Sequence, residues 1–183
     1  MQSEKLIQLL KEQTRQHVTE VEKLQRCDLH TLTWRESDTS WNTLECLQHL
    51  NLYSDFYLPE IEKQIIASHT QHDINFKSGL LGGYFAKSML PNGKLKKMKT
   101  FKSKNPLHKE LHITVLDTFI QEQIKLLDLL NQSNHISLNK VKIKTSISSF
   151  LKLRLGDTFQ FLINHIIRHL RQIERIQSAQ QYT

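Results

Sequence analysis

The chain has 183 residues and a formal net charge of +7, and 38% of its residues are hydrophobic while 23% are charged. This composition is that of a globular protein with a real core, and it argues against a disordered or fibrous chain. The apolar runs are too short for a membrane span, and the start of the chain lacks the apolar core of a signal peptide. We therefore expect a single domain over residues 1–183, no membrane partner and a cytoplasmic location. The two cysteines, Cys27 and Cys46, suit a reducing compartment.

The positive charge is concentrated in one part of the chain. Between Ile74 and Lys109 there are nine lysines and no Asp or Glu, whereas the rest of the chain carries 16 Lys and Arg residues against 18 acids. A nucleic-acid surface typically interleaves Arg and aromatic side chains on an ordered face. The run here is all lysine: Lys94, Lys96, Lys97, Lys99, Lys102 and Lys104. We interpret it as a solvated connection rather than a phosphate-binding patch.

The first helix is expected from about Glu4 to about Arg26, with His17 on its apolar stripe. Because His17 is alone there, we interpret it as a residue at the edge of the core rather than a metal ligand. The polar segment that follows predicts a loop, with Ser40 as the N-cap of a second helix.

The second helix is expected to start near Trp41 and to place His49 on its inner side, one turn from Tyr53. The residues that it directs towards the core are Leu44, Leu47, Leu50, Phe56 and Ile61. Pro59 lacks a backbone N–H and clashes with the carbonyl of Asp55, which predicts a kink or break there.

A long connection is expected from His69 to Asn105, because it contains several glycines and the turn signal at residues 91–93. A connection of this length crosses the molecule and can join two helices that run parallel. We expect it to be anchored, as a short helical turn, by Leu80, Leu81, Tyr84, Phe85, Met89 and Leu90.

A third helix is expected from just after Pro106 to about Leu130, with His108 and His112 near its start. The segment 131–156 contains β-branched residues typical of short extended pieces, while its lysines argue against a buried sheet. The last helix is expected to open at Gly156, with Asp157 as N-cap, and to end around Ser178. Four amphipathic helices predict an all-α four-helix bundle.

The last helix carries His165 and His169 four residues apart on its apolar side. This spacing places two imidazoles one turn apart on the same face, so both can reach one metal ion. The residue after His165 is Ile166 rather than Glu, which excludes the HExxH signature of zinc proteases. On spacing alone, two partly buried histidines that are hydrogen-bonded to their neighbours remain the alternative.

Two stretches resemble the DinB/YfiT-like superfamily. Residues 40–50, SWNTLECLQHL, look like an early segment of that family, and residues 155–173 are similar to its last helix. The resemblance implies an up-down-down-up four-helix bundle with a long crossover between helices 2 and 3. It also implies a divalent metal ion, usually zinc or nickel, held by three histidines, which in this chain are His49, His165 and His169.

Three imidazoles leave coordination positions open for water or substrate, as in catalytic sites. The resemblance implies a thiol S-transferase that uses a low-molecular-weight thiol, or a hydrolase, acting on a small electrophilic substrate. Two residues near His49 are candidates for a catalytic role. They are Glu45, whose alternative role is that of a solvated helix residue, and Tyr53, whose alternative is to fill the core.

The alternative hypothesis is that the protein is a binding protein rather than an enzyme. In that case it is a non-catalytic helical bundle that contacts an acidic partner or nucleic acid through the lysine-rich crossover at residues 94–104. A homodimer is compatible with either hypothesis, and no feature of the sequence decides it.

Overall fold

The structure is a computed structural model that describes residues 1–91, 99–148 and 150–182. Within these ranges the protein is predominantly helical with a small two-stranded antiparallel sheet, as the composition predicted. The elements in chain order are α1 (Ser3–Leu24), α2 (Leu29–Thr33), α3 (Thr43–Ile66), α4 (Leu80–Met89), η1 (Lys102–Lys104), α5 (Thr114–Gln132), η2 (Ser133–His135), β1 (Lys142–Lys144), β2 (Lys152–Arg154) and α6 (Leu155–Gln180). Among the helices described, none is both long and apolar enough to cross a bilayer.

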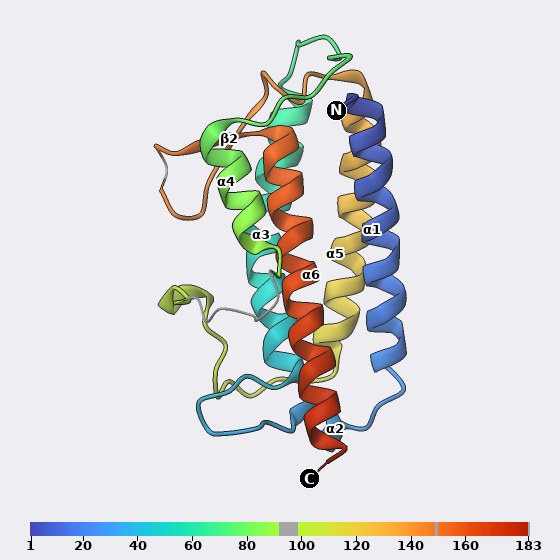
Figure 1. The fold of residues 1–183 in the computed structure, drawn as a ribbon, viewed down its shortest axis with the longest axis vertical. Coiled ribbons are helices and arrows are strands. Elements are labelled where there is room, and N and C mark those ends of the chain that lie inside the picture. Colours follow the sequence, from blue (N-terminus) through green and yellow to red (C-terminus); the bar gives the residue numbers. More distant parts are fainter. Residues whose placement is uncertain (92–98, 149, 183) are drawn as a thin grey trace.

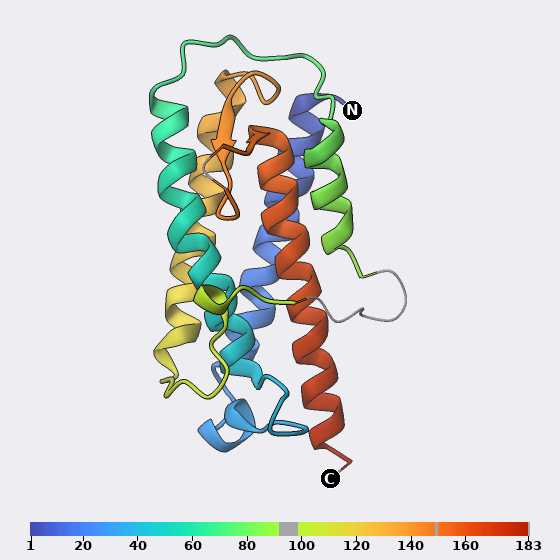
Figure 2. The ribbon, with the colours of Figure 1, turned by 90° about the vertical axis from the view of Figure 1, so that its left-hand side faces the viewer.

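Four long helices, α1, α3, α5 and α6, lie side by side (Figure 1). The chain runs down α1 and α6 in this view and up α3 and α5. Because α3 and α5 follow one another yet point the same way, the chain between them must return along the molecule. Figure 2 shows this connection crossing one end of the helices and then descending beside α6 as α4.

The interior is filled by aliphatic and aromatic side chains from all four long helices. Leu10, Leu47, Phe119 and Phe159 are each at most 2% exposed. Burying one such side chain stabilises the fold by about 1.5–3 kcal/mol. The two clusters of buried side chains lie towards opposite ends of the helices, and His49 and His169 lie among the members of the second, beside Leu50 and Leu170.

The start of α3 differs from the prediction. Asn42, not Ser40, is its N-cap: the Asn42 side chain accepts from the backbone N–H of Glu45 at 2.8 Å, and the Glu45 carboxylate accepts from the N–H of Asn42 at 2.9 Å. The two contacts form a capping box. The hydroxyl of Ser40 instead pairs with that of Ser37 at 2.6 Å.

The predicted break near Asp55 is absent, because α3 continues through Pro59 as one helix. Residues on both sides of the proline, Tyr57 and Ile61, are almost fully buried and keep the two halves packed against the core. Phe56, which was expected in the core, is instead exposed.

The crossover forms α4, but most of its predicted anchors are wrong. Leu80, Leu81, Tyr84 and Leu90 are exposed, and of the predicted set only Met89 is buried while Phe85 is partly buried. The buried face of α4 is made by Gly82, Ala86 and Met89. A Cβ atom at Gly82 would overlap the carboxyl group of Asp157, so glycine permits the close approach of α4 to α6.

The last two predicted helices start at other residues than expected. The third, α5, begins at Thr114 rather than just after Pro106. The fourth, α6, begins at Leu155, and Asp157 does not cap it. The buried Asp157 carboxylate instead accepts from the Ser78 hydroxyl and from the N–H of Gly79 at 2.9 Å, which ties α6 to the start of α4. The extended pieces predicted in this segment are confirmed only in part: Ile143 lies in β1, whereas Ile147 and Phe150 lie outside both strands of the β1–β2 hairpin.

Candidate metal centre

Two long helices bring three buried histidines together. His49 projects from α3, and His165 and His169 project from α6 one turn apart. Their exposed fractions are 3%, 5% and 7%. Side chains at i and i+4 share a face of a helix, so the direction of the α6 pair follows from the local sequence. The position of His49 beside them depends on the packing of α3 against α6.

The three Nε2 atoms face one another. The Nε2 of His165 lies 3.2 Å from the Nε2 of His49 and 3.0 Å from the Nε2 of His169. The Nδ1 of His49 lies 2.6 Å from the carbonyl oxygen of Lys104, and the Nδ1 of His169 lies 3.0 Å from Oε1 of Gln172. Both oxygens only accept, so the proton of each of these two rings is on Nδ1. The Nε2 atoms of His49 and His169 are therefore bare lone pairs.

The environment keeps the three rings neutral. Burial lowers the pKa of His49 to about 4 and that of His169 to about 3. Burial also lowers the pKa of His165 well below its usual value, and the adjacent His169 and His49 lower it further. Neutral imidazole is the form that binds metal ions.

The cluster is short of protons for hydrogen bonding among its own members. A neutral His165 with its proton on Nε2 can donate to only one of the two lone pairs that face it. The other contact then brings two nitrogens within hydrogen-bonding distance with no suitably placed proton. A buried arrangement of this kind is unfavourable unless a cation lies among the lone pairs.

Two of the three nitrogen separations in the cluster fit a metal ion. Three nitrogens at about 2.1 Å from a common ion lie about 3.0 Å apart when their bonds are at right angles and about 3.4 Å apart in a tetrahedral site. The two measured separations, 3.0 and 3.2 Å, match this range. The three residues form a group whose ligand atoms all lie within 4.8 Å of one another.

Hydrogen bonds outside the cluster hold the rings in place. Lys104 contributes its backbone carbonyl to His49, and its ammonium group donates to the carbonyl of Leu52. The neighbouring Asn105 accepts from the indole N–H of Trp41 at 3.1 Å. Lys104, predicted as part of a solvated run, thus belongs to a strap of residues 102–105 that crosses α3 at His49.

Aromatic rings enclose the cluster. The ring of Tyr53 lies 5.0 Å from that of His49 and 4.7 Å from that of His165, measured between centroids. The indole of Trp41 lies 4.7 Å from the ring of His49 and 5.7 Å from that of His169. Burial raises the pKa of Tyr53, so its phenol group keeps its proton at neutral pH.

Glu45 is a structural residue rather than a solvated one. Its side chain is fully buried, closes the capping box of α3, and forms an ion pair with Arg35 at 3.0 Å. It also accepts from the backbone N–H of His108 at 2.6 Å. With both oxygens occupied, the carboxylate holds the start of α3 and the residues after Pro106 together.

The remaining histidines singled out in the sequence lie away from the cluster. His108 and His112 are exposed and precede α5. His17 is buried on α1, and its Nδ1 has no hydrogen-bond partner. It is therefore a core residue, more deeply placed than the predicted position at the edge.

Sequence reasoning missed Gln172, Trp41 and the strap at Lys104. Gln172 could have been found, because it lies three residues after His169 and therefore on the same side of α6. Lys104 offers no such signal, since it is 55 residues away from His49 in the chain and contributes a backbone atom.

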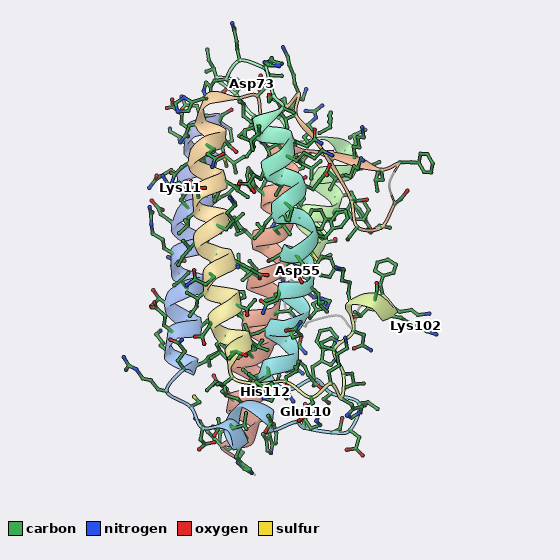
Figure 3. All side chains as sticks on the ribbon, turned by 180° about the vertical axis from the view of Figure 1, so that it is seen from behind. Lys11, Asp55, Asp73, Lys102, Glu110 and His112 are labelled. Atoms are coloured by element: carbon green, nitrogen blue, oxygen red, sulfur yellow. The ribbon has the colours of Figure 1, made fainter. Side chains whose placement is uncertain are left out.

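A separate groove of about 600 Å³ lies between α3 and α5, and none of the three histidines lines it. Its walls include Asp55 and Glu122. Burial, together with the nearby Asp55, raises the pKa of Glu122 to about 8. Asp55, labelled in Figure 3, marks the position of this groove.

Comparison with known proteins gives one result that covers most of the chain. No curated protein and no solved structure matches the sequence. The family model of the DinB superfamily matches residues 11–173, a range that includes all three clustered histidines. The chain therefore belongs to the DinB superfamily.

Proposed function

We propose that the protein is a metal-dependent enzyme with an up-down-down-up four-helix-bundle fold. In this proposal His49, His165 and His169 hold one divalent ion, zinc or nickel. The observation that carries it is the Nε2 atom of His165, which lies 3.2 Å from that of His49 and 3.0 Å from that of His169, both of them bare lone pairs. Membership of the DinB superfamily supports the same proposal.

The reaction that we propose is transfer of a low-molecular-weight thiol to a small electrophilic substrate, or hydrolysis of such a substrate. A divalent ion held by three neutral imidazoles lowers the pKa of a bound water or thiol and leaves coordination positions open. Glu45 is unsuited as the general base, because its oxygens are engaged with Asn42, Arg35 and His108.

The surrounding residues have distinct roles in this proposal. Lys104 and Gln172 accept from the two Nδ1–H groups and so turn the Nε2 atoms of His49 and His169 inward. Tyr53, whose phenol stays protonated, supplies a hydrogen-bond donor beside the site. Trp41 and Tyr53 cover the rings and limit the access of water.

Metal analysis tests the site. Protein purified without a chelator or a polyhistidine tag is expected to contain about one zinc or nickel ion per chain. The His49→Ala variant is expected to lose the ion, and the matched His112→Ala variant to keep it. Metal-free wild-type protein that also fails to bind added zinc or nickel would rule the site out.

Activity is tested separately on the loaded protein. A low-molecular-weight thiol is mixed with an aryl halide whose thioether product absorbs light, and an activated ester serves as the hydrolysis substrate. Turnover of either one by the wild type, lost in His49→Ala and retained in His112→Ala, is expected. A fully loaded protein that turns over neither substrate would contradict the enzymatic proposal while leaving the metal site intact.

A further inference from the structure

The short helix α4 is apolar on two faces but is covered on only one. Gly82, Ala86 and Met89 face α6, and the side chain of Asn164 on α6 donates to the carbonyl of Ala86 at 2.9 Å. On the outer face Leu80 is 97% exposed and Tyr84 is 68% exposed. A helix that is apolar all round is normally buried, so the outer face is suited to a partner.

The β1–β2 hairpin exposes apolar side chains beside α4. Phe150, near its tip, is 95% exposed, and Ile147 is also exposed. The base of the hairpin is joined to the chain just before α4, because the guanidinium of Arg154 donates to the carbonyl of Lys77. Figures 1 and 2 show α4, the hairpin and the strap that contains η1 on the same side of the long helices.

The exposed residues of this side form what we call the basic apolar face. Its apolar members are Leu80, Leu81, Tyr84, Phe101, Ile147 and Phe150. Its basic members are Lys77, Lys87, Lys99, Lys102, Lys144 and Lys152, all exposed. The two segments that supply every one of these residues, 74–109 and 129–156, contain no Asp or Glu.

The rest of the chain has the opposite net charge: outside these two segments it carries 11 Lys and Arg residues against 18 acids. Helix α5 is acidic, with Asp117, Glu122 and Asp128 against Lys125, whereas α1 carries four acids and four Lys or Arg residues. Figure 3 shows the two sides, with Lys102 on the basic apolar face and Lys11 on α1 at the far edge. The net charge of +7 is therefore the sum of two basic segments and an acidic remainder.

We propose that the basic apolar face docks on an anionic lipid surface. Nearly fully exposed side chains such as Leu80 and Phe150 stand clear of the protein and can enter the region between lipid headgroups and acyl chains. The surrounding lysines then meet the anionic headgroups, where each basic residue strengthens binding. The proposal is independent of the metal site and of its chemistry.

Other partners fit the face less well. A symmetric dimer through this face would bring the same patch of each copy together and place lysines against lysines. Single-stranded nucleic acid is recognised by stacking on aromatic rings, and only Tyr84, Phe101 and Phe150 offer one. The other three apolar members, Leu80, Leu81 and Ile147, have no ring to stack. Exposed aliphatic side chains ringed by lysines match lipid better.

The test is co-sedimentation of the full chain with vesicles. Binding is expected to vesicles of phosphatidylcholine mixed with phosphatidylglycerol, to weaken as salt is added, and to be much weaker with phosphatidylcholine alone. The Leu80→Ser/Phe150→Ser double variant is expected to bind at least about tenfold more weakly. Changing Lys144 and Lys152 to Gln is expected to weaken binding about fivefold per lysine.

Matched controls come from the opposite side. Ile124 on α5 is 50% exposed, so Ile124→Ser removes a comparable exposed apolar group. Lys11→Gln removes a positive charge from α1. Both variants are expected to bind the mixed vesicles as the wild type does, and unchanged thermal unfolding curves establish that all variants fold.

Several results would overturn the proposal. They are equal binding to both kinds of vesicle, no binding to either, and binding that the Leu80→Ser/Phe150→Ser variant leaves unchanged. Binding of a single-stranded oligonucleotide in place of the vesicles would also overturn it. So would a dimer, detected by sedimentation equilibrium, that this double variant dissociates.

Discussion

Two regions of this protein contain histidines four residues apart, and only one of them forms a cluster. His165 and His169 lie on α6, are almost fully buried, and face each other with their Nε2 atoms 3.0 Å apart. His108 and His112 have the same spacing but lie outside a helix and are exposed. The spacing therefore predicts a site only where the backbone between the two residues is helical and the face that carries them is buried.

Local hydrogen bonds explain why α5 does not begin earlier, within residues 107–113. The N–H of Leu107 donates to the side chain of Asn105, and the N–H of His108 donates to Glu45 on α3. His108 adopts a φ of 61°, in the left-handed region, which ends any regular helix at that point. The packing of this segment against α3 thus outweighs the helical preference of the sequence.

The largest expected difference between the two regions is in metal binding. We expect His169→Ala to weaken zinc binding more than about a hundredfold, since losing a ligand costs more than losing the group that orients it. His112→Ala is expected to leave the affinity unchanged. Competition with a chromophoric chelator measures both, and equal affinities in the two variants would mean that the α6 pair is not a metal site.

His17 is buried but lies outside the cluster, so it shows the effect of burial on a histidine without that of metal binding. Burial lowers the pKa of His17 to about 4, below the ordinary value of 6.5. Between these values the unfolded chain binds a proton that the folded chain does not, so the free energy of unfolding falls as the pH drops from about 6.5 to about 4.

In the metal-free wild-type protein the free energy of unfolding falls between pH 7 and pH 4.5. We expect it to fall by about 2–3 kcal/mol less in the His17→Leu variant, which has no imidazole at this position to protonate. Urea denaturation at the two pH values measures it. The exposed His112→Ala variant is the control and should lose stability as the wild type does. A His17→Leu variant with the wild-type pH dependence would show that His17 titrates normally.

The orientation of the rings gives a smaller effect. Gln172→Ala removes the acceptor of the Nδ1–H of His169, and we expect zinc affinity to fall about tenfold. Gln172→Glu keeps an acceptor and should restore the affinity. Gln177→Ala, further along α6, is the matched control. If Gln172→Ala binds zinc as tightly as the wild type, the hydrogen bond does not orient His169.

The smallest expected effect is that of a substitution at His108, which is expected to raise the stability of the fold rather than weaken a property of the protein. Because φ is positive there, glycine relieves a strain of roughly 1–2 kcal/mol but makes the unfolded chain more flexible. We expect His108→Gly to be up to about 1 kcal/mol more stable, measured by chemical denaturation. His165→Gly, in the middle of α6, should destabilise the protein, and a loss of stability in both variants would contradict this difference.

Several features of the fold could be predicted from local pattern. The helical class and the long helices that became α1, α3 and α6 were readable from periodicity and turn residues, whereas the pairing of β1 with β2 was not. The starts of helices were not, because the caps depend on competing partners. Asn42 caps α3 because Glu45 reciprocates, while Asp157 is drawn away from α6 to the backbone of Gly79.

The sequence by itself determined that His165 and His169 share a face of one helix, because their spacing matches the helical repeat. Only the tertiary structure decided that His49 meets them, that Lys104 and Gln172 set the direction of their nitrogens, and that Glu45 is structural. The physical reason is that helical periodicity is a local property, whereas contacts between distant segments depend on how whole helices pack. The exposure of Leu80 and Leu81 belongs to the same class, since α4 has two apolar faces and only its packing against α6 selects the buried one.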